Sequence, residues 1–278
     1  MGGLTSYGKL SALVTGASSG IGRALALRLA REGARVALVA RREAELEAVA
    51  SQIRAADREA LVLPCDVAEP SQVAAVAVRA LERFGRIDLL VNNAGYGRHC
   101  SFLDWDLADA ERMLRVNTLG AVYATKALLP QMVERGSGWV VFMASVAGKI
   151  APPEESVYAA SKFALVGLAE ALSLEVEDLG VHVLTVCPGA IRTPFFDAAA
   201  LERLPPVARR WMVEPEPLVD AIVAALAEGR HELTFPRRIA PAYAVRALAP
   251  GLMRRMMRRS TIDALARERT REEGRSGA

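Results

Sequence analysis

Cysteine, histidine and lysine are scarce in this 278-residue sequence. The three cysteines, Cys65, Cys100 and Cys187, are too few and too scattered for a disulfide framework. None of them lies in a Cys/His cluster with the spacing of metal ligands. These absences argue against a disulfide-stabilised secreted domain and predict no metal site, so we expect a reducing, cytoplasmic setting.

Long apolar runs are also missing. No stretch reaches the roughly 18 uninterrupted apolar residues of a membrane-spanning helix. The first eight residues lack the charged segment followed by an apolar run that a signal peptide would show. We therefore expect a soluble chain, or at most one that is peripheral to a membrane surface.

The net charge of +3 is small but unevenly distributed. Arg237–Arg275 contains eleven arginines and four acidic residues, which leaves the rest of the chain slightly acidic. The main body therefore offers no surface of the kind that binds nucleic acid.

Short apolar runs alternate with longer segments of helical period, a pattern typical of repeated βαβ units. The expected strands are Leu10–Thr15, Arg35–Ala40, Ala60–Pro64, Ile87–Val91, Trp139–Ala144, Val181–Cys187 and Glu232–Phe235. The expected helices are Ile21–Arg31, Glu43–Ala56, Ser71–Phe84, Ala108–Glu134 and Ser156–Leu179.

These runs predict one α/β domain with a Rossmann-like, doubly wound parallel sheet of about seven strands and helices on both faces. The strand segments do not alternate in polarity, as expected when helices cover both faces of a sheet. Ligands of such sheets bind beyond the carboxyl ends of the strands. We place the dinucleotide-binding and catalytic domain at residues 1–235 and a basic, amphipathic extension at residues 236–278.

A glycine-rich turn, Thr15-Gly-Ala-Ser-Ser-Gly-Ile-Gly22, separates the first expected strand from the first helix. Glycines there let the backbone approach a pyrophosphate, and the helix N-terminus points at its negative charge. The alternative is a turn that only caps the helix. Its position directly after a strand favours dinucleotide binding.

Arg41 and Arg42 follow the second expected strand, where an acidic side chain would bind the adenosine ribose of NAD. A guanidinium instead pairs with a 2′-phosphate through charge-assisted hydrogen bonds. These residues predict NADP(H) as the cofactor, unless they are merely solvated residues at the start of a helix.

The order of several short motifs resembles the short-chain dehydrogenase/reductase family over about residues 8–235. The motifs are TGASSGIG at 15–22, CDV at 65–67, NNAG at 92–95, Asn117, Ser145, Tyr158 with Lys162, and Pro188-Gly189. Each motif alone is weak, whereas the ordered set is specific.

The resemblance implies an NADP(H)-preferring oxidoreductase that acts on CH–OH groups, and it implies a homo-oligomer. It places Asp66 and Val67 beside the adenine, Asn93 and Gly95 under the cofactor, and Ile191 and Thr193 at the nicotinamide carboxamide. The full set expected to bind cofactor is Gly16, Ser18, Ser19, Gly20, Ile21, Gly22, Arg41, Arg42, Asp66, Val67, Asn93, Ala94, Gly95, Tyr158, Lys162, Pro188, Gly189, Ile191 and Thr193.

Tyr158 and Lys162 are four residues apart on an expected helix, so both side chains project from one face. A free phenol titrates near pH 10. A nearby ammonium and an oxidised nicotinamide both favour the phenolate, so we expect the pKa of Tyr158 to be lowered beside them. The alternative is a surface tyrosine stacked on a lysine stem.

Ser145 follows the Trp139–Ala144 strand, and its hydroxyl can donate to a substrate carbonyl as charge develops there. Asn117 lies within a helical stretch where asparagine is unfavourable, which predicts a local bend. The resemblance assigns it a proton relay through Lys162; a capping or solvated asparagine is the alternative. We expect the catalytic residues to be Ser145, Tyr158, Lys162 and Asn117.

The segment from Thr193 to Val213 contains Phe195, Phe196 and Trp211 among other apolar residues. We interpret it as a lid over the cleft, which favours a lipophilic carbonyl or alcohol substrate. The alternative is that these side chains pack on the core or on another subunit.

The extension after Phe235 mixes apolar and arginine residues. It can pack against protein, which we favour, cover the substrate opening, or lie on anionic lipid. For the whole chain, the alternatives to a carbonyl/alcohol oxidoreductase of lipophilic substrates are a 3-oxoacyl carrier reductase and a non-catalytic NADP(H)-binding sensor.

Overall fold

The structure is a computed structural model. It describes all residues except 1–2, 5, 9, 197, 205 and 263–278. The end of the expected extension (263–278) and two residues of the expected lid, Asp197 and Pro205, therefore lie outside the described residues.

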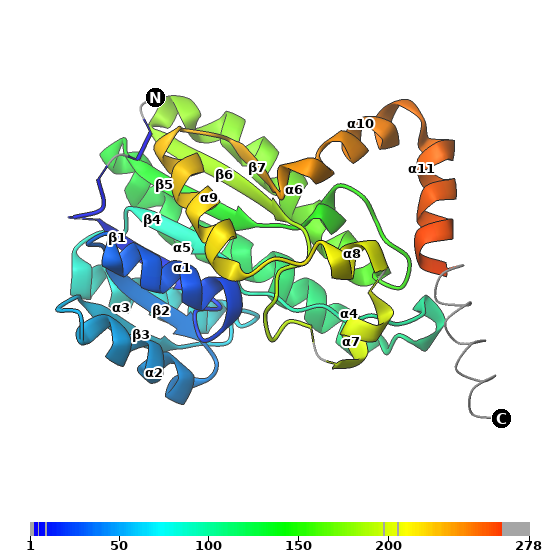
Figure 1. Cartoon of the computed structure of the whole chain (residues 1–278). Coiled ribbons are helices and arrows are strands. Elements are labelled where there is room, and N and C mark those ends of the chain that lie inside the picture. The colour runs from blue at the N-terminus through cyan, green and yellow to red at the C-terminus, as the bar shows by residue number, and fades with distance from the viewer. Residues whose placement is uncertain (1–2, 5, 9, 197, 205, 263–278) are drawn as a thin grey trace.

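Seven parallel strands form one sheet in the order β3-β2-β1-β4-β5-β6-β7 (Figure 1). The strands are β1 (Ser11–Thr15), β2 (Arg35–Ala40), β3 (Ala60–Pro64), β4 (Leu89–Asn92), β5 (Gly138–Met143), β6 (Val181–Pro188) and β7 (Glu232–Phe235). After β3 the chain returns to the other side of β1, so the winding direction reverses between β1 and β4. This confirms the predicted doubly wound sheet, and a reversal of this kind leaves a crevice for ligands at the carboxyl ends.

Helices cover both faces of the sheet (Figure 1). One apolar layer packs α1 (Gly20–Arg31), α2 (Glu43–Arg54) and α9 (Pro215–Ala227) against the sheet. The other packs α3 (Pro70–Phe84), α5 (Gly120–Arg135) and α6 (Ser156–Val176). Every residue of β1 and of β6 is buried, as two covered faces require.

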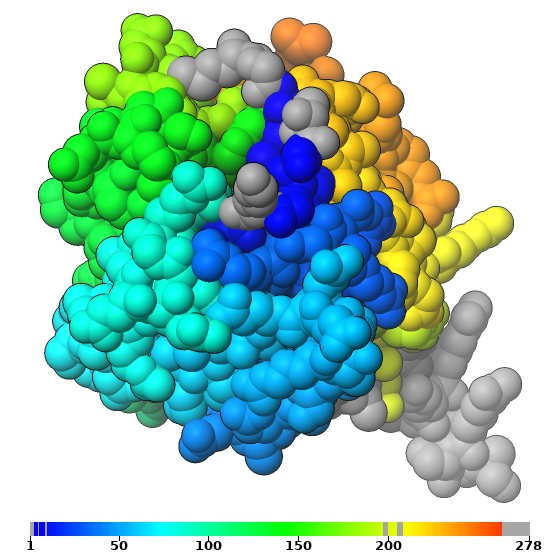
Figure 2. Space-filling view, turned by 90° about the vertical axis from the view of Figure 1, so that its left-hand side faces the viewer, coloured from blue at the N-terminus to red at the C-terminus, as the bar shows by residue number. Residues whose placement is uncertain are grey.

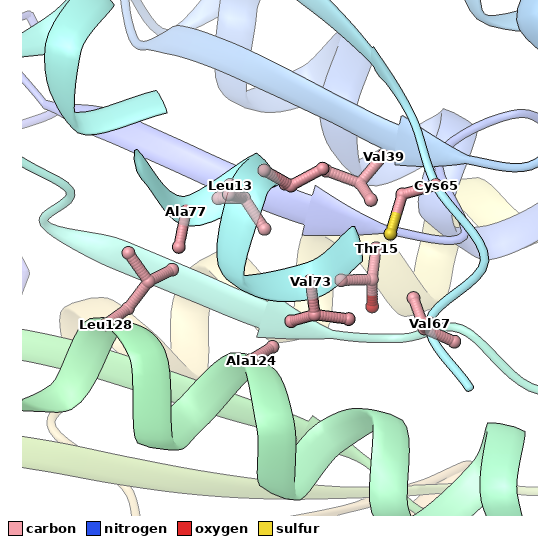
Figure 3. Close-up of a pocket in the computed structure, with 10 residues that line it drawn as sticks. Leu13, Thr15, Val39, Cys65, Val67, Val73, Ala77, Ala124 and Leu128 are labelled. Carbon is pink, nitrogen blue, oxygen red and sulfur yellow. The ribbon is translucent and has the colours of Figure 1, made fainter. Parts of the chain in front are cut away.

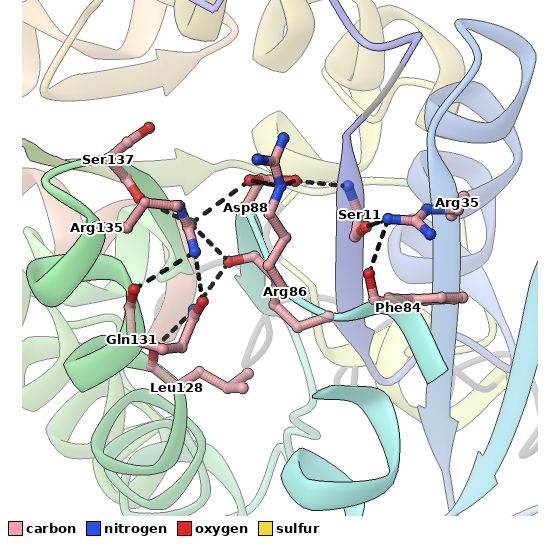
Figure 4. A network of polar contacts seen from close by, with 10 residues as sticks. Ser11, Arg35, Phe84, Arg86, Asp88, Leu128, Gln131, Arg135 and Ser137 are labelled. Carbon is pink, nitrogen blue, oxygen red and sulfur yellow. Dashed lines mark hydrogen bonds and ion pairs between the residues drawn. The ribbon is translucent and has the colours of Figure 1, made fainter. Parts of the chain in front are cut away.

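The amino ends of the strands are joined by a polar network on the side away from those carboxyl ends (Figure 4). The Asp88 carboxylate accepts a hydrogen bond from the Ser11 amide at 2.9 Å and pairs with Arg86 and Arg135. Arg35 donates to the Ser11 hydroxyl and to the Phe84 carbonyl. These contacts fix the starts of β1, β2 and β4 relative to one another. Figure 2 views this side, where the dark blue N-terminal segment lies between the blue-cyan and the green-yellow parts of the chain.

The expected helical stretch Ala108–Glu134 is present but changes type along its length. α4 (Leu107–Leu114), a π-helical turn (Arg115–Leu119) and α5 follow one another without a gap, so the local irregularity expected at Asn117 takes the form of a π-helical turn. The π turn arises where the Asn117 side chain bonds to the Tyr96 backbone rather than facing solvent.

Four short helices follow β6 and β7. α7 (Ala198–Arg203) and α8 (Pro206–Arg210) lie in the expected lid, and α10 (Pro241–Leu248) and α11 (Pro250–Met257) belong to the extension. The extension helices project from the carboxyl side of the sheet (Figure 1).

One helix of the described residues, Ser156–Leu179, is long and apolar enough to span a bilayer, but half of its most apolar window is buried within the fold. A buried core helix such as α6 passes the same test.

Candidate functional site

A cleft of about 1210 Å³ lies at the carboxyl ends of the strands. It is lined by the loops that follow β1 to β6, by the lid segment and by the extension. Of the residues expected to bind cofactor or to act in catalysis, all line this cleft except Gly22 and Asn117. Because single small-molecule sites typically measure about 300–1,000 Å³, the cleft has room for a dinucleotide and a second molecule.

The glycine-rich turn has little room for side chains. Gly16 and Gly20 have φ angles of +67° and +55°, which other residues rarely adopt. A Cβ on Gly16 would lie 2.8 Å from Asn93 Nδ2, and one on Gly22 would lie 2.3 Å from the Gly16 carbonyl oxygen. Gly22 thus lies behind the turn and supports it, while the turn itself faces the cleft.

The loop after β4 is held against the end of β1. Asn93 Nδ2 donates to the Thr15 carbonyl at 2.9 Å, and the amides of Asn93 and Ala94 donate to the Thr15 hydroxyl at 3.0 Å. These bonds join the two loops that flank the reversal of the sheet, which fixes the floor of the cleft beside the N-terminus of α1.

Arg42 extends over the glycine-rich turn. Its guanidinium donates to the hydroxyls of Ser18 and Ser19, both at 3.1 Å, and pairs with Glu45 at 3.3 Å. Arg41 also lines the cleft. The end of β2 therefore presents two cations and no carboxylate to the cleft.

Asp66 lies near the start of the loop after β3, and other protein groups hold its side chain. Its carboxylate accepts from the Ala68 amide at 3.0 Å and pairs with Arg112. Burial raises the pKa of Asp66, but the bonds from Arg112 and Ala68 outweigh burial and hold that pKa below its usual value. Its carboxylate is thus fixed at the edge of the cleft.

Ser145, Tyr158 and Lys162 meet at the centre of the cleft, where all three are at most 9% exposed. Ser145 follows β5 and accepts a hydrogen bond from the Ala147 amide at 3.0 Å. Lys162 Nζ donates to the Met143 carbonyl at 2.8 Å and lies 5.7 Å from the centroid of the Tyr158 ring. The helical spacing of four residues places both side chains on one face of α6, as predicted.

Burial shifts both ionisable groups toward their neutral forms. It raises the pKa of Tyr158, although a hydrogen bond with Ser145 opposes the rise. It lowers the pKa of Lys162 to about 8. The expected lowering of the Tyr158 pKa is therefore wrong for the protein by itself, because desolvation of the phenolate outweighs the favourable interactions around it.

Asn117 lies behind the cleft and is only 1% exposed. Its Nδ2 donates to the Tyr96 carbonyl at 2.9 Å and to the Ser161 hydroxyl at 3.0 Å, and its Oδ1 accepts from the Tyr96 amide. A Cβ on Gly95 would lie 3.1 Å from Asn117 Oδ1 and 3.4 Å from Lys162 Nζ. Asn117 therefore connects the loop after β4 to α6 beside Lys162, and the solvated alternative is wrong.

The segment expected to form a lid packs on Tyr158. The Phe195 ring centroid is 5.6 Å from that of Tyr158 and 4.9 Å from that of Phe196. Trp211, at the end of the lid, stacks under the Arg238 guanidinium of the extension at 4.7 Å. Lid and extension thus meet across the cleft.

Two groups of cleft residues were missed from the sequence. The first is Glu155, which lines the cleft and lies 2.9 Å from His99, a residue outside the lining; the separation of 56 positions between the two gave no sequence signal. The second group is the inner side of the extension, namely Arg238, Ile239, Ala242, Met253, Met256, Met257, Arg259, Ser260 and Thr261. The apolar residues of the extension were recognised in the sequence, but their contact partners could not be predicted from it.

A second hollow of about 10 Å³ lies inside the core between the sheet, α3 and α5 (Figure 3). Its wall includes Leu13, Val39, Cys65, Val73 and Leu128. This volume is that of one water-sized probe, and it is enclosed by apolar groups, so it is a packing void rather than a ligand site. Among the described residues, no group of three or more His, Cys, Asp or Glu side chains is placed to hold a metal ion.

Comparison with known proteins agrees with this geometry. The profile of the family described as short chain dehydrogenase matches residues 11–203. The chain is 41% identical over 206 residues to oxidoreductase UcpA of Escherichia coli, covering 74% of this chain and 77% of that protein. It is 36% identical over 214 residues to the ketoacyl reductase HetN of Nostoc, covering 77% and 74%.

Two solved structures share the fold over most of their length. A short chain dehydrogenase/reductase from Burkholderia phymatum in complex with NAD has a TM-score of 0.82 at 28% identity, covering 90% of this chain and 96% of that one. A short-chain dehydrogenase from Sphingobium yanoikuyae in complex with NADPH has a TM-score of 0.77 at 32% identity, covering 88% and 95%. The chain therefore belongs to the short-chain dehydrogenase/reductase family and is an oxidoreductase.

Proposed function

We propose that this protein is an NADP(H)-dependent reductase that interconverts a lipophilic carbonyl compound and its secondary alcohol. The observation that supports it most strongly is that Ser145, Tyr158 and Lys162 line the same cleft as the glycine-rich turn. A cofactor bound at the turn and the side chains that transfer the proton can therefore lie next to each other in one cleft.

The residues of the cleft fit a nicotinamide dinucleotide. The turn between β1 and α1 brings bare backbone and a helix N-terminus to the cleft, and both favour a pyrophosphate. When bound, such a cofactor supplies or accepts the hydride of the reaction.

The preference for NADP(H) is supported by Arg41 and Arg42. Arg42 already bonds to two hydroxyls of the turn, so its guanidinium is held where a 2′-phosphate would need a partner. Similar solved structures contain either NAD or NADPH, so this preference depends on the two arginines of this chain.

Four side chains take part in the proposed chemistry. Ser145 holds the carbonyl oxygen, and the Tyr158 hydroxyl gives its proton to that oxygen during reduction and takes it back during oxidation. Lys162, when charged, stabilises the phenolate that remains on Tyr158. Asn117 positions the loop and α6 around Lys162 and, as the family resemblance implies, takes part in a proton relay through it.

A lipophilic substrate is supported by the walls of the cleft. The cleft is lined by apolar side chains of the lid and of the loop after β5, namely Phe195, Phe196, Leu204, Trp211 and Ile150. Apolar walls of this size favour a bulky apolar ligand, since both surfaces lose contact with water. Activity confined to small polar sugars or polyols would contradict this part of the proposal.

Reduction of a 3-oxoacyl group bound to a carrier is a second candidate. The similarity to a protein named ketoacyl reductase favours it, and Arg238 and Arg259 at the cleft could contact an acidic carrier. A 3-oxoacyl thioester turned over far faster than simple lipophilic ketones would favour this candidate.

Replacement of Tyr158 by phenylalanine tests the proposed chemistry. We expect NADPH oxidation with a panel of lipophilic ketones to fall about 10²–10⁴-fold, the usual contribution of a general acid, while NADPH binding measured by fluorescence stays unchanged. Tyr123→Phe, on α5 outside the cleft, is the matched control. Near-normal turnover in Tyr158→Phe would refute the assignment, and NADPH binding without turnover of any ketone by the native protein would favour a sensor.

Two further predictions remain. α4, the π turn that follows it and α6 expose the apolar residues Leu107, Leu114, Leu119 and Leu174. This exposure supports association of like subunits through the helical stretches around α4 to α6. Cytoplasmic location is likewise proposed on the scarcity of cysteine.

A further inference from the structure

The extension after β7 differs in charge from the rest of the described chain. Residues 237–262 contain seven arginines and no acidic residue. Arg254 and Arg255 are exposed on α11. This segment therefore has a strong positive field that no carboxylate within it offsets.

The extension also exposes large apolar groups. Leu248 is 86% exposed, and Leu252, Met256 and Ile262 are each 50% exposed. Single exposed apolar residues are ordinary, but four within fifteen residues, interspersed with arginines, form a mixed surface of the kind that marks an interaction site.

The inner side of these helices is fixed to the domain, which gives the outer side a defined direction. Arg246 stacks over the Phe163 ring of α6 at 4.8 Å and donates to the Lys149 carbonyl at 2.5 Å. Tyr243 accepts a hydrogen bond from Thr234 of β7 at 3.3 Å, and Met253 is buried against the cleft. Leu248 and Leu252 take no part in these contacts, and neither do Arg254 and Arg255 of α11.

We propose that the outer side of α10 and α11, defined by Leu248, Leu252, Arg254 and Arg255 and bordered by Met256 at the cleft, docks on an anionic lipid surface. Leucines on such a helix enter the boundary between headgroups and acyl chains, while arginines bind the phosphate groups and cover apolar surface with their stems. We call it the docking surface.

Other occupants fit it less well. A symmetric contact with a second copy would bring like arginines together, which opposes association. A nucleic acid would pair with the arginines but would give the exposed leucines no apolar partner. Lipid satisfies both kinds of side chain at once.

Docking would place the cleft next to the bilayer. Met256 is half exposed at the border of the docking surface and also lines the cleft. Resting on the proposed function, this position lets a lipophilic carbonyl compound pass from the acyl layer to Tyr158 without crossing water.

Vesicle flotation of the full chain tests the docking. We expect binding to vesicles of phosphatidylcholine with about 30% phosphatidylglycerol, at least roughly tenfold weaker binding to pure phosphatidylcholine, and release by about 0.5 M salt because screening weakens charge attraction. Arg254→Gln with Arg255→Gln should weaken binding roughly tenfold or more, and Leu248→Ser with Leu252→Ser should do the same.

The matched control is Val78→Ser with Arg79→Gln on α3, where Val78 is 54% exposed. This variant should bind like the native chain. Equal binding to both kinds of vesicle, no binding to either, or native binding by both docking-surface variants would overturn the proposal, as would a dimer that the leucine variant converts to monomers. Turnover of a water-soluble ketone should be unchanged in these variants, so failure of docking and failure of the proposed chemistry give different results.

Discussion

The Lys162 ammonium nitrogen lies 5.7 Å from the centroid of the Tyr158 ring and donates to the Met143 carbonyl at 2.8 Å. This bond joins α6 to the end of β5, the strand that also leads to Ser145. Ser145, Tyr158 and Lys162 are thereby held in one cleft. Burial favours the neutral forms of Tyr158 and Lys162, so the charge on Lys162 depends closely on pH.

The first prediction concerns Arg42. Changing Arg42 to glutamate should weaken NADPH binding roughly 10–100-fold, because a charge-assisted hydrogen bond contributes about 1.5–3 kcal/mol and the new carboxylate repels a phosphate. NADH binding should change little. Fluorescence titration of both cofactors measures this, with Arg31→Glu on the outer surface of α1 as control. Equal losses for both cofactors would contradict the proposed role.

The second prediction concerns space in the glycine-rich turn. A Cβ on Gly22 would meet the Gly16 carbonyl oxygen at 2.3 Å, so Gly22→Ala should lower the free energy of unfolding by about 2 kcal/mol or more and abolish NADPH binding. A Cβ on Gly167 of α6 would meet no other atom within 4 Å. Gly167→Ala should therefore stabilise the chain by about 0.5–1 kcal/mol, and chemical denaturation would show whether the two variants differ in sign.

The third prediction is the pH dependence that Lys162 imposes. Burial lowers its pKa from 10.5 to about 8. Between these values the unfolded chain binds more protons at this site than the folded chain, so the site contributes stability as pH rises above about 8. From pH 7.5 to 9, the native chain should gain about 1 kcal/mol relative to Lys162→Met. Urea denaturation at both pH values measures the gap, and a gap independent of pH would refute the prediction.

The fourth prediction separates stability from function. Asp88 belongs to the polar network at the amino ends of the strands (Figure 4), away from the cleft. Asp88→Ala leaves the Ser11 amide and two arginines without this partner and should cost about 1–3 kcal/mol of stability. NADPH affinity and turnover at room temperature should remain native. A large loss of affinity with unchanged stability would show that the two edges of the sheet are coupled.

The local pattern of apolar residues was sufficient to predict the strands of the sheet. The bounds of β2, β3 and β7 agree with those expected from the sequence, because covered parallel strands read as short apolar runs between turns. The Tyr158 and Lys162 pair was equally predictable, since four residues of helix place two side chains on one face.

Longer-range features were less accessible to the sequence. The irregularity at Asn117 was anticipated as a bend, but its form depends on Tyr96, 21 positions away. The rise in the pKa of Tyr158 in the protein alone was not predicted, because desolvation depends on packing by distant segments. The partners of the extension were also left open for this reason.

Sequence alone determined the strands, the glycine-rich turn, the two arginines after β2 and the pairing of Tyr158 with Lys162, because each depends on neighbours within a few residues. Only the tertiary structure decided that α10 and α11 form a wall of the cleft, that Glu155 meets His99, and that Tyr158 favours its protonated form. These features arise where segments far apart in the chain exclude water from one another, and burial of that kind has no local pattern.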